Sequence, residues 1–293
     1  MTQPCATASN YIVRRKQASH FPDWLAMLVL FCVLPTAVSA SDQSQVETII
    51  QRSVEANNLD WKVAPEYGHF ERDVQDPGTR TYQVMMIGGS PYQRLVAINE
   101  KPLTAEEQAE QEQKLQQVIA QRKRESPQQR AARIARYEKD RKRDHLLMDQ
   151  LTKGFNFTLE GEQKLGPYEV YVLRAKPRPG YVPPNNEAKV LTGMEGTLWI
   201  DKSTFQWVKV EAQAVRPVSI EGFLARIEPG TRFELEKMPV SDGIWLPKHF
   251  AMKAHAKILF VFNHREEEDE TYWGYQKQTP TAEAEQQSLS DHH

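Results

Sequence analysis

The sequence predicts an α+β protein built on one large, curved antiparallel sheet, an open half-barrel covered by helices, with a charged helical pair inserted. Three observations predict this fold class. Short strand-like segments meander along most of the chain, one charged block at residues 104–153 has helical character, and a helix with one apolar face precedes the strands. A single wide sheet has one apolar face to cover, and such helices can cover it.

The start of the chain has the features of a cleavable export signal. Three basic residues at 14–16 precede an apolar run at 25–34, which is shorter than the ~20 residues that a bilayer span needs. Val38 and Ala40 fit the small-residue positions of a signal-peptidase site. We therefore expect cleavage after Ala40, a periplasmic or secreted location, and no membrane span after processing. An uncleaved anchor helix is the alternative.

Composition excludes several classes of function. Both cysteines, Cys5 and Cys32, precede the expected cut, so the processed chain has no disulfide, thiolate zinc site or cysteine nucleophile. The formal net charge of the chain is −2 and becomes more negative once the basic residues at 14–16 are removed. A charge of this sign does not favour nucleic acid as a partner.

After the cut we expect one domain over residues 41–277, with the helical insertion at 104–153 and a disordered polar tail at 278–293. The domain begins with a helix over residues 45–57. Ser44 and Glu47 have the spacing of a capping box, in which each side chain bonds a free backbone N–H of the first turn. The apolar face of this helix consists of Val46, Ile49, Ile50 and Val54.

Strand-like segments follow, joined by Gly- and Pro-containing turns or short polar segments. The expected strands are 61–74, 80–87, 92–98, 155–162, 168–175, 197–201, 205–215, 222–228, 231–239, 244–254, 257–264 and 270–276. The acidic stretch at 264–269 has the composition of a charged, solvated turn.

The insertion predicts two helices in tandem, at 105–124 and 127–153. Thr104 and Ser126 each begin a capping box. Acidic residues alternate with the basic ones of the second helix at pairing distances, which favours a salt-bridged, solvated face over a nucleic-acid or membrane-binding one. Because apolar residues are sparse, we expect only the ends of this pair to touch the core.

No catalytic or cofactor motif occurs in the sequence. A nucleophile elbow, a P-loop and a dinucleotide-binding glycine pattern are all missing, and the histidines show no metal-ligand spacing. We therefore expect no catalytic residue, no cofactor, no metal and no enzymatic activity. A hydrolase whose carboxylates meet only in three dimensions is kept as a third hypothesis.

Apolar residues on the later strands predict a ligand-binding face. Alternation selects an inward-facing set, which is Leu198, Ile200, Val208, Val210, Phe233, Leu235, Phe260 and Phe262. These residues form either an ordinary core beneath the helices or a partly covered groove for an acyl chain or another apolar ligand. The face of Trp199 and Trp207 is the competing choice.

Three segments resemble a known family: Gly196–Asp201, its return strand Trp207–Val210, and Gly243–Pro247. With the order of helices and strands over about residues 45–276, the chain resembles the periplasmic lipoprotein-carrier superfamily of LolA, LolB and RseB. The resemblance implies an unclosed β-barrel with helices plugging its mouth, which binds lipidated protein, lipid or a partner protein. The long helical pair at 104–153 departs from that pattern.

Two hypotheses about function follow. The first is a non-enzymatic periplasmic carrier or binder of an acyl chain, lipid or lipoprotein, which requires an apolar cavity that reaches solvent. The second is an envelope protein-interaction or sensing module that uses the helical pair at 104–153 as its contact surface and has a filled core.

Overall fold

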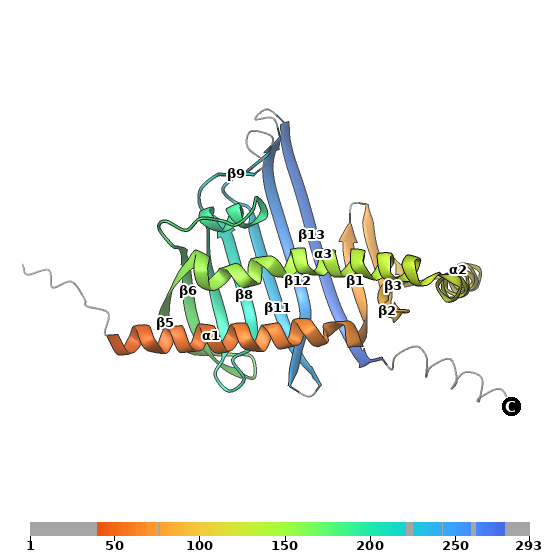
Figure 1. The fold of residues 1–293 in the computed structure, drawn as a ribbon, viewed down its shortest axis with the longest axis horizontal. Coiled ribbons are helices and arrows are strands. Elements are labelled where there is room, and N and C mark those ends of the chain that lie inside the picture. Colours follow the sequence, from red (N-terminus) through yellow and green to blue (C-terminus); the bar gives the residue numbers. More distant parts are fainter. Residues whose placement is uncertain (1–39, 76, 221–224, 242, 259–261, 279–293) are drawn as a thin grey trace, which may run out of the picture. The chain divides into compact units, whose positions relative to one another are not determined.

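The computed structural model describes residues 40–75, 77–220, 225–241, 243–258 and 262–278. They form one sheet with α-helices on one of its faces (Figure 1). No helix within these ranges combines the length and the hydrophobicity that a membrane span needs.

Several expectations fall outside this description. The export signal up to residue 39, the tail from residue 279 and Phe260 lie outside the described residues. Gln278, which we expected to begin the tail, is described: its N–H donates to Glu66 O at 2.7 Å, and its side-chain oxygen accepts from Met86 N–H at 2.7 Å.

The sheet is antiparallel throughout and is not closed. Its strands are β1 (Tyr67–Gln75), β2 (Gly78–Ile87), β3 (Ser90–Ile98), β4 (Lys101–Pro102), β5 (Phe155–Leu165), β6 (Tyr168–Pro177), β7 (Met194–Asp201), β8 (Trp207–Ala214), β9 (Val218–Ile220), β10 (Ala225–Ile227), β11 (Arg232–Ser241), β12 (Ile244–Ile258) and β13 (Phe262–Lys277). The order is β4-β3-β2-β1-β13-β12-β11-β8-β7-β6-β5. Strands β9 and β10 lie off this path, where β10 pairs with both β12 and β9. The two ends, β4 and β5, do not meet, which agrees with the predicted open half-barrel.

Three α-helices occur in the described residues: α1 (Ala40–Val63), α2 (Ala105–Arg124) and α3 (Pro127–Gly154). Short 3-10 helices follow α1 and precede β7, at Ala64–Glu66 and Glu187–Gly193. Helices α1 and α3 run across one face of the sheet (Figure 1), which we call the helix-covered face.

The first helix is longer than the sequence predicts. It begins at Ala40, so Ser44 lies inside it and the capping box expected there is wrong. The Ser44 carbonyl instead accepts from Thr48 Oγ1 at 2.9 Å, and Gln43 Nε2 donates to Glu47 Oε1 at 3.2 Å. Because the helix continues through the polar residues before Ser44, intrahelical hydrogen bonds satisfy the backbone N–H groups that a cap at Ser44 would otherwise bond.

The inserted helices confirm the predicted pair. Thr104 and Ser126 both form complete capping boxes, with Glu107 and Gln129 as their partners. The expectation that only the ends of the pair touch the core is wrong, because the middle of α3 packs on α1. Arg141 lies over the Trp61 ring at 4.5 Å from its centroid, a contact between two half-buried side chains.

The end of the sheet also differs from the prediction. Strand β12 continues through residues 255–258, and the acidic stretch at 264–269 lies inside β13 instead of forming a turn. Cross-strand contacts accommodate these residues: Lys253 Nζ lies 3.2 Å from Glu267 Oε2, and His249 Nε2 lies within hydrogen-bonding distance of Asp269 Oδ1, at 3.3 Å. The opposite charges of Lys253 and Glu267, which face one another across two strands, stabilise a pairing that each strand's composition disfavours.

The largest hydrophobic cluster lies between α1 and the strands β5 to β8. The helix contributes Val46, Ile49 and Ile50, which are 2–5% exposed. The buried residues opposite them are Phe155, Leu173, Ala175, Leu191, Leu198, Ile200, Trp207 and Val210. The apolar face predicted for the first helix is therefore the cover of the sheet.

Candidate functional site

The structure brings together most of the residues predicted to face a ligand. Leu198, Ile200 and Val210 are buried in the cluster under α1, and Phe233 and Leu235 are half-buried against it. They thus belong to, or pack against, the cluster that also contains Val46, Ile49 and Ile50 of α1. Whether they also contact a ligand stays a prediction. Of Phe262 only the backbone, paired with Ile258, is described.

Val208 lies apart from this set because of a β-bulge. Trp199 pairs with Lys209 and Ile200 pairs with Trp207, which leaves Val208 without a partner across β7. The extra residue reverses the alternation. Val208 consequently packs with Val170 and Trp245 in a separate cluster, and Trp199 and Trp207 do not share one face.

A cavity of about 490 Å³ lies between the first half of α1 and the edge strand β5. We call it the edge cavity. Its apolar wall consists of Val46, Ile50, Val54, Phe155 and Phe157. Its polar rim consists of Gln43, Glu47, Gln51, Glu55, Thr152, Asn156 and Arg178. The volume lies within the range of about 300–1,000 Å³ that is usual for small-molecule sites.

The edge cavity adjoins the buried cluster. Val46, Ile50 and Phe155 belong to both, so the wall of the cavity is also the border of the core. The Arg178 guanidinium closes the end next to α3 by donating to Asn156 Oδ1, Thr152 O and Phe155 O, each at 3.1 Å. These hydrogen bonds give Arg178 a structural role at the rim.

A buried ion pair fastens the other half of α1 to the sheet. Lys237 Nζ donates to Asp60 Oδ2 at 2.5 Å and to Asn57 Oδ1 at 2.8 Å. Asp60 Oδ1 also accepts from Gln206 Nε2 at 3.0 Å and from Trp245 N–H at 3.1 Å. Burial lowers the pKa of the Lys237 ammonium, and the Asp60 carboxylate opposes that shift. The two ends of α1 are thus held by different kinds of contact.

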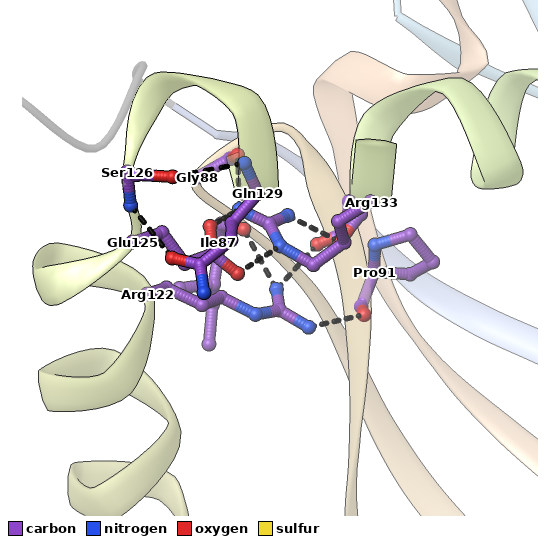
Figure 2. Close-up of polar contacts among 9 residues, drawn as sticks. Ile87, Gly88, Pro91, Arg122, Glu125, Ser126, Gln129 and Arg133 are labelled. Atoms are coloured by element: carbon purple, nitrogen blue, oxygen red, sulfur yellow. Dashed lines mark hydrogen bonds and ion pairs between the residues drawn. The ribbon is translucent and has the colours of Figure 1, made fainter. Parts of the chain in front are cut away.

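The junction between α2 and α3, which we call the elbow, is hydrogen-bonded to the turn between β2 and β3 (Figure 2). Arg122 Nη1 donates to Ile87 O at 2.7 Å and to Ser90 O at 2.8 Å. Arg133 donates to Gly88 O at 3.1 Å, to Ser90 Oγ at 2.7 Å and to both carboxylate oxygens of Glu125. That double hydrogen bond holds the pKa of Glu125 below its usual range. The elbow is therefore docked on the sheet.

Acidic residues gather on the helix-covered face beside β1. Glu270 lies directly opposite Phe250 on the neighbouring strand, and Phe250 lies directly opposite Leu235 on the strand after that. Residues opposite one another point to the same face of a sheet, and Leu235 packs on the core cluster under α1. The Glu270 side chain therefore faces α1 and α3. Burial raises the pKa of Glu270 and of Glu268, and the Tyr272 hydroxyl, which donates to Glu270, opposes the shift of Glu270. Within the described residues no group of His, Asp, Glu or Cys could hold a metal ion.

Sequence reasoning missed the edge cavity and the acidic group. The cavity depends on how α1 docks at β5, which the periodicity of neither element specifies. Its one sequence signal is the alternation of Phe155, Phe157 and Leu159 on a strand directly after a helix. Of the acidic group, the sequence predicts a turn at Glu268 because the stretch 264–269 lacks the usual β-forming residues, whereas Glu270 falls in the strand predicted at 270–276.

No protein-family model matches the chain, and no curated protein matches it. A LolA superfamily protein from Nitrosomonas europaea matches with 12% identity and a TM-score of 0.30, over 80% of this chain and 93% of that chain. A domain described as an outer membrane lipoprotein-sorting protein, from Vibrio parahaemolyticus, matches with 12% identity and a TM-score of 0.28, over 78% and 94%. The MucA/MucB complex of Pseudomonas aeruginosa matches with 11% identity and a TM-score of 0.23, over 80% and 99%. Two of these three structures carry the LolA or lipoprotein-sorting description that the sequence motifs resemble.

Proposed function

We propose that this protein is a non-enzymatic binder or carrier of an apolar ligand, the acyl chain of a lipid or lipoprotein, which enters between α1 and β5. The edge cavity is the observation that supports the proposal. Its wall is apolar and adjoins the cluster under α1, while its rim is polar and exposed. An acyl chain gains about 0.8 kcal/mol for each buried CH₂ group, and a polar rim leaves its head group in water.

The two halves of α1 are held to the sheet by different kinds of contact, and this difference suggests how the site accommodates a longer acyl chain. The second half of the helix is anchored by the Asp60–Lys237 pair, whereas Val46, Ile49 and Ile50 hold the first half through apolar contacts. An outward pivot of the first half exchanges those contacts for contacts with the acyl chain. The pivot extends the edge cavity toward Leu198 and Ile200, in the set predicted from the sequence to bind the ligand.

Fluorescence of cis-parinaric acid, an apolar probe with an acyl chain, tests the proposal. The variant Val54→Trp places a large ring in the edge cavity and is expected to weaken probe binding about tenfold or more, since it removes most of the space available to the chain. Val182→Trp is the matched control, because Val182 is 82% exposed and outside the cavity. Equal binding by both variants, or no binding by the unaltered protein, would refute the proposed site.

We further propose that the protein is exported and cut after Ala40. Ala40 and the residues after it belong to the helix α1, so a chain cut after Ala40 begins within the helix that covers the sheet. N-terminal sequencing of the protein from the envelope fraction is expected to give Ser41 as the first residue. A chain that retains the apolar run at 25–34 would show an anchored protein instead.

The exposed side of α3 favours a second candidate function, binding of an acidic envelope protein. Arg136, Lys139 and Lys142 are exposed, whereas Tyr137 and Arg141 on the opposite side of the helix are half-buried. A photo-crosslinker in place of Lys139 is expected to trap a defined partner in cells if this function is correct. A crosslinker at Val182 serves as the control, and the same products from both positions would reject a specific partner.

A further inference from the structure

The two ends of the sheet differ in how their edges are protected. At one end the last strand, β4, is two residues long and contains Pro102, and α2 lies along β3. Arg94 Nη2 there lies 3.1 Å from Glu112 Oε2, and Gln108 Nε2 donates to Leu103 O at 2.7 Å. At the other end β5 is 11 residues long and pairs with β6 alone in the described part of the chain. A short strand, a proline and a covering helix are the usual protection of a sheet edge. β5 is long and contains no proline, and α1 and α3 contact it without a helix lying along its open edge in the way that α2 lies along β3.

The register shows which backbone groups of β5 point to the open edge. Arg178 N–H donates to Gly154 O at 2.7 Å, and the pairs that follow are Phe155 with Pro177 and Asn156 with Lys176. Hydrogen-bonded and non-hydrogen-bonded pairs alternate along antiparallel strands. The backbone groups of Asn156 and Thr158 therefore bond to β6, whereas those of residues 155, 157 and 159 point away from it.

Phe155 already uses its outward groups. Its N–H donates to Leu151 O at the end of α3, and its carbonyl accepts from Arg178 Nη2 at 3.1 Å. Phe157 and Leu159 have no such partner: within the described residues, no hydrogen bond outside the β5–β6 pairing reaches their N–H or C=O groups. These groups form a short row of unpaired donors and acceptors.

Other protective features are confined to the second half of β5. A bulge lies between Leu159 and Gly161, and the strand carries Glu160, Glu162 and Lys164. Bulges and charges at an edge discourage pairing with another chain. The preceding stretch 155–159 carries no charge, and its first three residues, 155–157, line the edge cavity.

The edge cavity gives a pairing strand a place for its side chains. Phe157 lines the cavity, and residues directly opposite one another on paired strands have their Cβ atoms about 4.5–5.5 Å apart on the same face. The first turn of α1 extends past β5 (Figure 1), so an added strand would lie beside this overhang. Glu47 and Glu55 form the exposed acidic part of the rim, while Arg178 is engaged in its own hydrogen bonds.

We infer that the edge of β5 at Phe157–Leu159 binds an extended segment of a partner protein by strand addition. The segment alternates apolar residues, which enter the edge cavity, with polar ones, and it carries basic residues that face Glu47 and Glu55. Main-chain hydrogen bonds supply affinity in this mode of recognition, and pockets for alternate side chains supply specificity. The inference rests on the proposed function, because the same cavity receives the apolar groups of the ligand.

The test uses a fluorescein-labelled synthetic peptide in which valine alternates with threonine between terminal lysines, added to the protein purified from cells. Two further peptides carry N-methyl groups on every second residue, offset from each other by one position. Each methylated peptide has one blocked edge, because successive N–H groups of a strand point to opposite sides. Strand addition is expected to weaken binding of one methylated peptide about tenfold or more and to leave the other unchanged. Equal loss or equal retention in both would overturn the inference.

Two readouts on the protein sharpen the result. Amide exchange at Phe157 and Leu159 is expected to slow when the unmethylated peptide binds, while exchange at Asn156 and Thr158, already bonded to β6, changes little. Glu47→Lys is expected to weaken binding of the lysine-ended peptide and to favour a glutamate-ended one. Glu106→Lys, an exposed change on α2 away from the cavity, is the matched control.

Binding of cis-parinaric acid separates this inference from the proposed function. Probe binding that is lost in Val54→Trp, together with failure of every peptide, would overturn strand addition and leave the proposed function standing. Failure of both the probe and the peptides would overturn both. A dimer in analytical ultracentrifugation whose formation excludes the peptide would assign the β5 edge to a second copy of this chain and also overturn the inference.

Discussion

Single residues decide how α1 is attached to the sheet. Asp60 is 3% exposed and Lys237 is 8% exposed, and a charge buried to this degree needs a partner and further hydrogen bonds. Asn57, Gln206 and the Trp245 N–H provide them. A buried pair of this kind does not necessarily add stability over an apolar pair. Its hydrogen bonds join Asn57 and Asp60 of the helix to Lys237, Gln206 and Trp245 in the register that the structure shows.

We predict that Lys237→Met destabilises the protein by about 3–5 kcal/mol, because it leaves the Asp60 carboxylate buried without its countercharge. The double variant Asp60→Leu with Lys237→Met is expected to lose much less, since neither charge remains. Urea unfolding followed by tryptophan fluorescence measures both. Lys248→Met, which removes an exposed partner of Glu236, is the control and should cost no more than about 1 kcal/mol. Equal losses for the single and the double variant would contradict a role for charge.

At the scale of elements, α1 and α3 support each other through one aromatic contact. The rings of Trp61 and His145 stack with centroids 4.3 Å apart and planes 13° apart. His145 Nε2 also lies 2.8 Å from Asn58 Oδ1. Burial lowers the pKa of His145 below its ordinary value, Arg141 acts in the same direction, and Asp149 opposes them. The contact between the two helices is consequently linked to pH.

The sign of this linkage follows from the lowered pKa of His145. The folded state binds fewer protons than the unfolded state, so stability decreases as the pH falls from the ordinary histidine pKa of about 6.5 toward the lowered one, and it levels off below that. We predict that His145→Phe, which keeps the stacking, reduces the loss of stability between about pH 7 and pH 5. Urea unfolding at both pH values measures the difference. The same pH dependence in both proteins would exclude His145 as its source.

At the scale of the whole molecule, β13 joins the two ends of the domain. It pairs with β1 on one side and with β12 on the other, so it links the strands before the helical pair to those after it. Its partner β12 precedes it directly, whereas its other partner β1 lies far away in the sequence, with Tyr67 opposite Lys277. Contacts of such long range close large loops and contribute only when the rest of the sheet is in place, which makes folding of the sheet cooperative.

We predict that a chain ending at Ile258 does not fold, because β1 and β12 both lose their shared neighbour. A chain ending at Gln278 is expected to keep the melting temperature of the complete protein, since the hydrogen bonds of Gln278 with Met86 of β2 and with Glu66 are retained. Near-ultraviolet circular dichroism and thermal unfolding compare the two. A folded monomer from the shorter chain would show that the two parts of the sheet are independent.

Part of the fold could be predicted because its signals are local. The capping boxes at Thr104 and Ser126 located the helices of the insertion, since a cap needs only residues within one turn. The alternation of Leu198 and Ile200 located two buried positions of β7 correctly. Local reasoning failed at Val208, because a bulge puts Val208 and Val210 on opposite faces and a bulge leaves little trace in composition.

The sequence by itself determined the class of the protein: antiparallel strands, helices as their cover, and a charged helical pair between two runs of strands. Each of these follows from periodicity and capping, which act over a few residues. Only the tertiary structure decided that β13 lies between β1 and β12, that Lys237 anchors α1, and that the edge cavity opens beside β5. These features depend on which distant elements pack together. That packing is determined by the total free energy of apolar burial and strand pairing over the whole chain.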